Sequence, residues 1–132
     1  NGSLLATISV KGEEKKYFSN MEDKWERPTL ILINSSTASS AEILAETLRY
    51  YNKAIIVGKN SYGKSSIQKA FPLNSENTLF LTTGKCYLAN GKTIEDSGVT
   101  PDYIIDDENQ QFLAAVSLLS RTGTQSAMQK AQ

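Results

Sequence analysis

A strand–helix–strand unit is predicted between Thr29 and Val57, and it constrains the fold more than any other feature. TLILIN (29–34) and AIIV (54–57) are short apolar runs of the kind that form strands buried on both faces. Between them, AEILAETLRYY carries apolar residues at helical spacing, namely Ile43, Leu44, Leu48 and Tyr51. Further strand-like runs follow this unit, so the pattern predicts a mixed α/β sheet.

More strands are predicted on either side of the unit. SLLATISV (3–10) alternates as a strand does, and the charged GEEKK (12–16) is interpreted as a turn before Tyr17 and Phe18. Polar SNMEDKWER (19–27) is predicted to be a loop in which Trp25 packs as an aromatic anchor. The remaining strand predictions are IQKAFPL, TLFLTTGKCYL and GVTPDYIID, with a turn at NSEN and an Asn90-Gly91 hairpin turn between CYL and KTI.

The helices have recognisable ends. Ser39 or Ser40 can cap the first helix, Glu42 stands at capping-box distance from Ser39, and Asn52 is predicted to stop the helix. The polar residues 121–132 are predicted to form a frayed tail. Before them, the pattern predicts a closing helix over 110–119 with one apolar face, formed by Phe112, Leu113, Val116 and Leu119.

Composition excludes several classes of function. Fourteen basic residues balance fourteen acidic ones, which gives no reason to expect nucleic acid or an anionic membrane as a partner. No apolar run approaches the roughly 18 residues of a membrane span. The chain has no histidine, so it cannot supply a Ser-His-Asp triad, a Cys-His pair or an HExxH metal site. Its one cysteine, Cys86, lies in an apolar run and is predicted to be a buried structural thiol.

The loop after the second apolar run allows a nucleotide-binding interpretation. Gly58, Gly63, Lys64 and Ser65 match GxxxxGKS, in which the backbone holds phosphates, the lysine contacts the outer phosphates and the serine binds magnesium. A phosphate-binding loop must open a substantial helix. Here Pro72 follows soon after the motif, and the residues beyond it are typical of strands. Asp106, the candidate magnesium ligand at the end of an apolar strand, lies near the chain end.

A second interpretation starts from Ser39. A serine after a buried strand, at the head of a helix, is well placed as a nucleophile, because the helix N-terminus offers N–H groups to an oxyanion. Without histidine, lysine is the main remaining base, and Lys64 lies in a loop between two apolar strands, where it can point inward. From the residues alone, Ser39 is equally a plain helix cap and Lys64 a solvated charge.

The ordered segments resemble the C-terminal processing peptidases, also called tail-specific proteases. That family shows an apolar strand ending in Asn, a run of the type GSASASEI, a helix, a strand ending VGE and a T-F-G-K-G-x-x-Q motif. The resemblance runs from about Pro28 to Asp106 and extends downstream to the family's FPL, LTTARYYTPSGRSI and GIxPDI. The matching segments of this chain are TLILIN, STASSAEI, LAETLRYY, AIIVGK, SYGKSSIQ, FPL, LTTGKCYLANGKTI and GVTPDYII.

The resemblance implies a serine endopeptidase that cleaves proteins near their C-termini, with the crotonase-like β-β-α core of an α/β protein. It places the nucleophile on Ser39, the lysine base on Lys64 and the lysine-orienting glutamine on Gln68, with the Ser40 backbone N–H as an oxyanion donor. It implies no metal and no cofactor. The partners it implies are protein or peptide substrates bound by their C-terminal region, outside the bacterial inner membrane or in a plastid lumen.

The chain also departs from the family pattern. Ser65 stands where the family has Gly and is predicted to restrict the loop beside the lysine, and Lys59 stands where Glu is frequent. Ser35 and Ser36 replace an acidic residue and Gly, and Ser40 and Ala41 reverse the usual order. A non-catalytic binding module that keeps the protease fold stays open as an alternative.

Family members carry a PDZ-like domain and a DxRxNxGG segment, with one oxyanion donor, ahead of this region. The resemblance therefore implies a core that is incomplete at its N-terminus. The segments expected are a hairpin and loop over 1–27, a catalytic core segment over 28–120 and a flexible tail over 121–132. Alone, the chain is expected to be weakly active or inactive and to self-associate through its exposed apolar surface.

Overall fold

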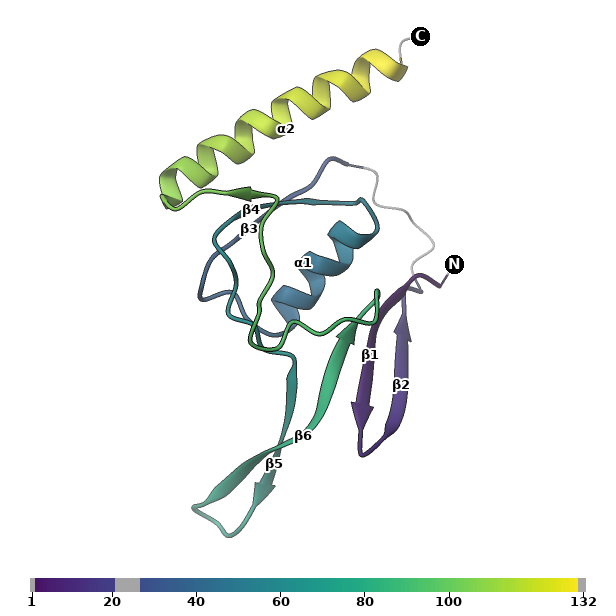
Figure 1. Cartoon of the computed structure of the whole chain (residues 1–132), viewed down its shortest axis with the longest axis vertical. Helices are drawn as coiled ribbons and strands as arrows, with labels where there is room; N and C mark the ends of the chain where they lie inside the picture. Colours follow the sequence, from purple (N-terminus) through teal and green to yellow (C-terminus); the bar gives the residue numbers. More distant parts are fainter. Residues whose placement is uncertain (1, 21–26, 131–132) are drawn as a thin grey trace.

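The computed structural model describes residues 2–20 and 27–130, with the backbone only over 122–130. Within them the chain forms one antiparallel sheet in the order β2-β1-β6-β5 and one parallel sheet in the order β3-β4-β7, together with two helices (Figure 1). The elements are β1 (Leu4–Val10), β2 (Glu13–Phe18), β3 (Leu30–Ile33), α1 (Ser40–Tyr50), β4 (Ile55–Gly58), β5 (Ser66–Pro72), β6 (Thr78–Leu88), β7 (Tyr103–Ile104) and α2 (Glu108–Lys130).

The predicted strand–helix–strand unit is present as β3, α1 and β4. The two strands pair in parallel from Leu30 opposite Ile55 to Ile33 opposite Gly58, so their carboxyl ends lie at the same edge of the sheet. Gly58 has a φ of 135°, and a Cβ there would meet the Ile33 carbonyl oxygen at 1.9 Å. Only glycine fits this close approach, and the loop after β4 therefore leaves the sheet directly beside the end of β3.

One apolar core joins the two sheets through α1. Its buried members come from β3, α1, β4, β6 and the segment that follows β6, and Ile31 and Ile43 pack against them. Near the end of α1, the Thr47 hydroxyl donates to the Leu5 carbonyl at 3.1 Å and the Tyr51 hydroxyl to the Leu4 carbonyl at 2.8 Å. These bonds hold the helix to the antiparallel sheet. The buried core residues are Ile33, Ala45, Ile56, Leu88, Ile94 and Val99.

The prediction of a turn at GEEKK is wrong. The turn lies at Lys11 and Gly12, both with positive φ, and the strand β2 begins at Glu13. Every residue of β2 is exposed, and the strand lies at the edge of its sheet. Charged side chains are a common protection of such edges, and for this reason a run of Glu and Lys forms a strand here.

The predicted hairpin at Asn90-Gly91 is only half formed. The turn is present, because the Gly91 N–H donates to the Leu88 carbonyl at 2.9 Å. No strand follows it over the described residues 92–98. That segment instead crosses to the loop after β4, where the Asp96 N–H donates to the Gly63 carbonyl at 3.0 Å.

Four further expectations differ from the structure or lie outside it. The strand β3 is not buried on both faces, since Leu32 is 43% exposed. In α2 the side chains of Gln111 and Ala115 are buried, whereas the predicted apolar face is exposed. The backbone of α2 continues through the predicted tail as far as Lys130. Trp25 lies outside the described residues.

Candidate active site

Two loops meet at the carboxyl ends of β3 and β4, and they carry the serine and the lysine singled out in the sequence. Residues 34–39 follow β3, and residues 59–65 follow β4. Backbone hydrogen bonds join the two loops, from Lys59 N–H to the Ile33 carbonyl at 3.0 Å and from Tyr62 N–H to the Thr37 carbonyl at 2.9 Å. In open α/β sheets, ligands bind outside the carboxyl ends of the strands, so this edge is the expected place for a site.

Ser39 precedes α1 in a strained backbone conformation. Its φ is 60° and its ψ is −123°, and the residue is exposed. A positive φ of this kind costs a non-glycine residue about 1–3 kcal/mol and is found most often where function requires it. A sharp turn from a strand into a helix also presents the nucleophilic serine of α/β-hydrolases. Ser39 is also the N-cap of α1, and it forms the capping box with Glu42 that the sequence predicted.

Ser40 is the first residue of α1, where backbone N–H groups have no acceptor within the helix. Its N–H donates no hydrogen bond to another described residue. The positive end of the helix dipole adds to this free donor. The arrangement therefore offers a hydrogen bond to a negatively charged oxygen formed next to Ser39.

Lys64 and Gln68 are in direct contact. The half-buried Lys64 donates from Nζ to Gln68 Oε1 at 3.2 Å. Gln68 lies on β5, whose pairing with β6 shifts register between Ile67 and Gln68. The sequence predicted that these two side chains lie together, and they do. No hydrogen bond joins Ser39 Oγ to Lys64 Nζ within residues 27–130, so the side chains of the serine and the lysine are not directly paired in this structure.

A buried carboxylate instead joins the backbones of the serine loop (residues 34–39) and the lysine loop (residues 59–65). Glu42, in the first turn of α1, is 0% exposed. Its Oε2 accepts the backbone N–H groups of Ser39 at 2.7 Å and Lys64 at 2.9 Å. Its Oε1 accepts the Gly63 N–H at 2.7 Å and the Ser61 hydroxyl. The sequence showed Glu42 only as a capping-box residue, because the donors from the second loop are not local to the helix.

A second carboxylate binds the residue after Lys64. Glu95 Oε2 accepts the Ser65 N–H at 2.6 Å and the Ser65 hydroxyl at 2.7 Å, and that hydroxyl also contacts Thr93 Oγ1 at 2.7 Å. These bonds, led by the one from the Ser65 side chain, hold the pKa of the Glu95 carboxyl below its ordinary value. No local sequence signal pointed to Glu95. Ser65 is 3% exposed and is held in place by this carboxylate, so it supports the loop rather than merely restricting it.

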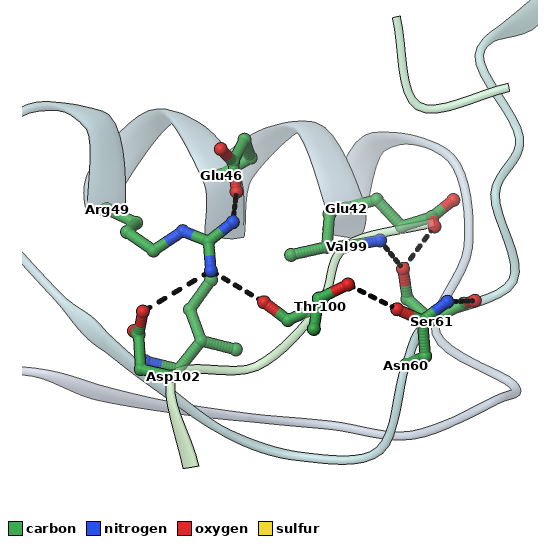
Figure 2. Close-up of polar contacts among 9 residues, drawn as sticks. Glu42, Glu46, Arg49, Asn60, Ser61, Val99, Thr100 and Asp102 are labelled. Carbon is green, nitrogen blue, oxygen red and sulfur yellow. Dashed lines mark hydrogen bonds and ion pairs between the residues drawn. The ribbon is translucent and has the colours of Figure 1, made fainter. Parts of the chain in front are cut away.

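The segment 97–102 makes hydrogen bonds to the lysine loop and to α1 (Figure 2). The Ser61 hydroxyl accepts the Val99 N–H at 2.6 Å, and the Asn60 side chain donates to the Ser97 carbonyl at 2.8 Å. Arg49 then fixes the same segment to the helix, because it donates to the Thr100 carbonyl at 2.6 Å. The loop position is therefore determined by contacts with residues far along the chain.

The nucleotide-binding interpretation does not fit this geometry. The residues after Gly63, Lys64 and Ser65 form the strand β5, so the loop does not open a helix as a phosphate-binding loop must. The Ser65 hydroxyl, which would bind magnesium, is occupied by Glu95 and Thr93. The GxxxxGKS match arises from a strand end, a loop and a lysine that contacts Gln68.

Other features of the described residues lie away from this site. A hollow of about 250 Å³ lies at the amino ends of β3 and β4, the opposite edge of the sheet, and is lined by Pro28–Leu30 and Asn52–Ile55. No group of three or more His, Cys, Asp or Glu side chains is arranged to hold a metal in the part of the chain that the structure describes. The helices α1 and α2, as described, are not long and apolar enough to cross a membrane. Cys86 is buried as predicted, and burial raises the pKa of its thiol.

Comparison with known proteins identifies the family. A profile of peptidase family S41 matches residues 1–105, which is most of the chain. The chain belongs to peptidase family S41. Among S41 relatives, a carboxy-terminal-processing protease of Bartonella bacilliformis is 40% identical over 104 residues, which cover 75% of this chain and 24% of the relative. A carboxyl-terminal-processing peptidase of Arabidopsis thaliana, named chloroplastic, is 33% identical over 98 residues, or 72% of this chain and 20% of the relative.

Solved structures share the mixed α/β fold of this chain. The photosystem II D1 C-terminal processing protease superposes with a TM-score of 0.71 at 27% identity, covering 81% of this chain and 28% of that one. A lipoprotein from Streptococcus agalactiae superposes with a TM-score of 0.74 at 22% identity, over 90% of this chain and 45% of that one, which shows a shared fold alone. The chain spans about a quarter of the length of the first S41 relatives that it matches.

Proposed function

We propose that this chain supplies the nucleophile and the base of a serine peptidase that cleaves proteins near their C-termini. One observation carries the proposal. In a member of family S41, the strained Ser39 and the lysine Lys64 have neighbouring backbones, because both donate to the same oxygen of Glu42. The chain has no histidine, so lysine is the main remaining candidate for the base, and Lys64 is the lysine whose backbone shares an acceptor with Ser39.

The first half of the reaction is acyl transfer to the serine. Lys64 Nζ, in its neutral form, takes the proton of the Ser39 hydroxyl while Oγ bonds to the carbonyl carbon of the scissile peptide. The carbonyl oxygen becomes negative and accepts a hydrogen bond from the Ser40 backbone N–H. The carbon–nitrogen bond then breaks, the departing amine takes the proton from Lys64, and an ester on Ser39 remains.

The second half regenerates the enzyme. Lys64 takes a proton from water, and the water oxygen bonds to the ester carbonyl carbon. When the bond to Ser39 breaks, the serine oxygen recovers the proton from Lys64, and the new carboxylic acid leaves. Gln68 supports both halves by accepting a hydrogen bond from Lys64 Nζ, which limits the directions in which the flexible lysine side chain points.

The partners follow from the same assignment. We expect protein or peptide substrates bound by their C-terminal region, as the names of the S41 relatives indicate for those proteins. We place the activity outside the bacterial inner membrane or in a plastid lumen, and one relative is named as chloroplastic. Exposed apolar side chains on β6, Leu79, Phe80 and Leu81, favour self-association.

The test is active-site labelling of the full-length protein that carries this chain, with a fluorophosphonate whose site is located by mass spectrometry. Ser39 is expected to displace fluoride from the probe and bond to its phosphorus, with a rate that rises toward alkaline pH because only a deprotonated amine accepts the proton. Lys64→Arg and Lys64→Ala are expected to lose labelling equally, since arginine does not give up its proton.

Two variants complete the test. Gln68→Ala is expected to be milder, because water can replace an orienting hydrogen bond. The control is Lys59→Ala, which removes a lysine from the same loop. Labelling at another residue, or full labelling of Lys64→Arg, would exclude the Ser39–Lys64 assignment. A protein that keeps the fold and is not labelled at all would instead be a binding module.

A further inference from the structure

Glu42 is a fully buried acidic residue that the proposed reaction does not use. It is 0% exposed, and none of the described residues pairs with it as a cation. Four donors converge on its two oxygens, three of them backbone N–H groups and the fourth the Ser61 hydroxyl. Each of the two oxygens accepts two hydrogen bonds, so the side chain acts here solely as an acceptor.

The donors come from the two loops that carry the proposed catalytic residues. The Ser39 N–H belongs to the turn before α1, and the N–H groups of Gly63 and Lys64 belong to the loop after β4. A single atom, Oε2, accepts from both Ser39 and Lys64, at 2.7 and 2.9 Å. This shared acceptor therefore ties the backbone of the serine to the backbone of the lysine.

We propose that Glu42 is a positioning residue, which sets the distance between Ser39 and Lys64 by binding the backbones of both. The inference rests on the proposed function. Catalytic groups must be held within about 0.5 Å of the productive geometry by the residues around them. Lys64 has a long and flexible side chain, so the position of its backbone, together with the bond from Gln68, decides where Nζ lies.

Neither glutamine nor aspartate can make the same four hydrogen bonds as the carboxylate of Glu42. Glutamine has one acceptor oxygen, and its NH₂ group would face backbone N–H donors on the other side. Aspartate keeps the charge and both oxygens but is shorter by one methylene. It therefore cannot reach from the first turn of α1 to both loops without moving one of them.

The experiment measures the rate of fluorophosphonate labelling of Ser39 as a function of pH, in the full-length protein and at a temperature at which every variant is folded. The variants are Glu42→Gln and Glu42→Asp. The control is Glu46→Gln, which changes the same residue type one turn later on α1, where Glu46 contacts Arg49 instead of the site. Thermal unfolding is followed in parallel to separate loss of stability from loss of positioning.

We expect Glu42→Gln to label about 10² times more slowly, as displacements of about 1 Å can cost, with a changed pH profile because the environment of the lysine changes. Glu42→Asp is expected to fall in between, and Glu46→Gln to label at the wild-type rate. Wild-type rate and pH profile in a destabilised Glu42→Gln would overturn the proposal, because a merely structural residue behaves in that way.

Three further outcomes are decisive. If Glu42→Gln does not fold, Glu42→Asp decides, and labelling of that variant at the wild-type rate overturns the positioning role. If the wild-type protein is not labelled on Ser39, the proposed function fails and the positioning role fails with it. Labelling of the wild type with no difference among the folded variants removes the positioning role alone.

Discussion

Ser39 and Lys64 donate their backbone N–H groups to the same oxygen atom of Glu42, at 2.7 and 2.9 Å. The two residues are far apart in the sequence, and the parallel pairing of β3 with β4 brings the loops after these strands together. The acceptor comes from α1, the helix that connects the same two strands. One supersecondary unit therefore supplies the proposed nucleophile, the proposed base and the group that holds them together.

Because the backbone at Ser39 is strained, we expect the Ser39→Gly variant to be more stable than the wild type and inactive. Ser39 has a φ of 60°, which glycine adopts without the clash that a Cβ causes. Ser39→Gly is therefore expected to raise the free energy of unfolding by about 1 kcal/mol, since the relieved strain exceeds the added freedom of the unfolded chain. Ser39→Ala keeps the Cβ and the strain, and we expect no gain. Urea unfolding of both variants checks this. A glycine variant no more stable than the alanine variant would show that the turn is unstrained.

Gly63 is expected to be irreplaceable, because its backbone has a positive φ and because there is no space for a side chain. Its φ is +90°, and a Cβ would meet the Gly98 nitrogen at 2.7 Å. Gly63→Ala is expected to lose more than about 2 kcal/mol of stability and to displace Lys64, so that labelling of Ser39 falls with it. Gly91 is the matched control, because its φ is +77° and nothing lies within 4 Å of an added Cβ. Equal losses for Gly91→Ala and Gly63→Ala would mean that the contact with Gly98 costs nothing.

The elements that sequence reasoning found are those whose signal is local. The apolar runs of β3 and β4 and the helical spacing of α1 are properties of neighbouring residues, and the structure has them within a residue or two of the prediction. The strand β2 was missed because its pattern is that of a charged, fully exposed edge strand. The segment after Asn90 was expected to pair as a strand, yet its polar side chains bind the lysine loop instead.

The same distinction holds for the site. Ser39, Ser40, Lys64 and Gln68 were predicted from local motifs that resemble a known family, whereas the contacts of Glu42 depend on donors from another loop. Ser65 was interpreted from its own size alone, because its partner Glu95 stands 30 residues away. Contacts between distant segments are decided by the tertiary fold, and a single sequence carries no direct record of them.

Asp102 is expected to stabilise the parallel sheet through a part-buried hydrogen bond. Its Oδ2 accepts the N–H of Ile56, which is 0% exposed, at 2.8 Å. Asp102→Ala leaves that N–H without its acceptor and is expected to cost about 1–3 kcal/mol. Asp102→Asn keeps one acceptor oxygen and should cost less, although its contact with Arg49 at 3.4 Å is weakened. Urea denaturation measures both, with the exposed Asp106→Ala as the control. Equal losses for the two Asp102 variants would show that the bond to Ile56 does not contribute.

Glu95 predicts how stability depends on pH. Hydrogen bonds from the Ser65 hydroxyl and N–H hold the pKa of this carboxyl below its ordinary value in the folded chain. A carboxyl with a lowered folded pKa contributes stability above its unfolded pKa of about 4.3, and that contribution is lost as the pH falls through the folded pKa. Glu95→Gln has no charge to lose. The difference in melting temperature between the wild type and Glu95→Gln is therefore expected to be largest near neutral pH and to shrink below about pH 4.3.

The control for Glu95 is Glu76→Gln, in the turn between β5 and β6, where the side chain makes no hydrogen bond to another described residue. Its melting temperature is expected to follow that of the wild type at every pH. The Ser65→Gly variant adds a second check, since it removes the hydroxyl that contributes most to the lowered pKa of Glu95. It should lose part of the pH dependence that Glu95→Gln loses in full. Melting curves for Glu95→Gln that run parallel to the wild type from neutral to acid pH would mean that the Ser65–Glu95 bonds do not hold the lysine loop.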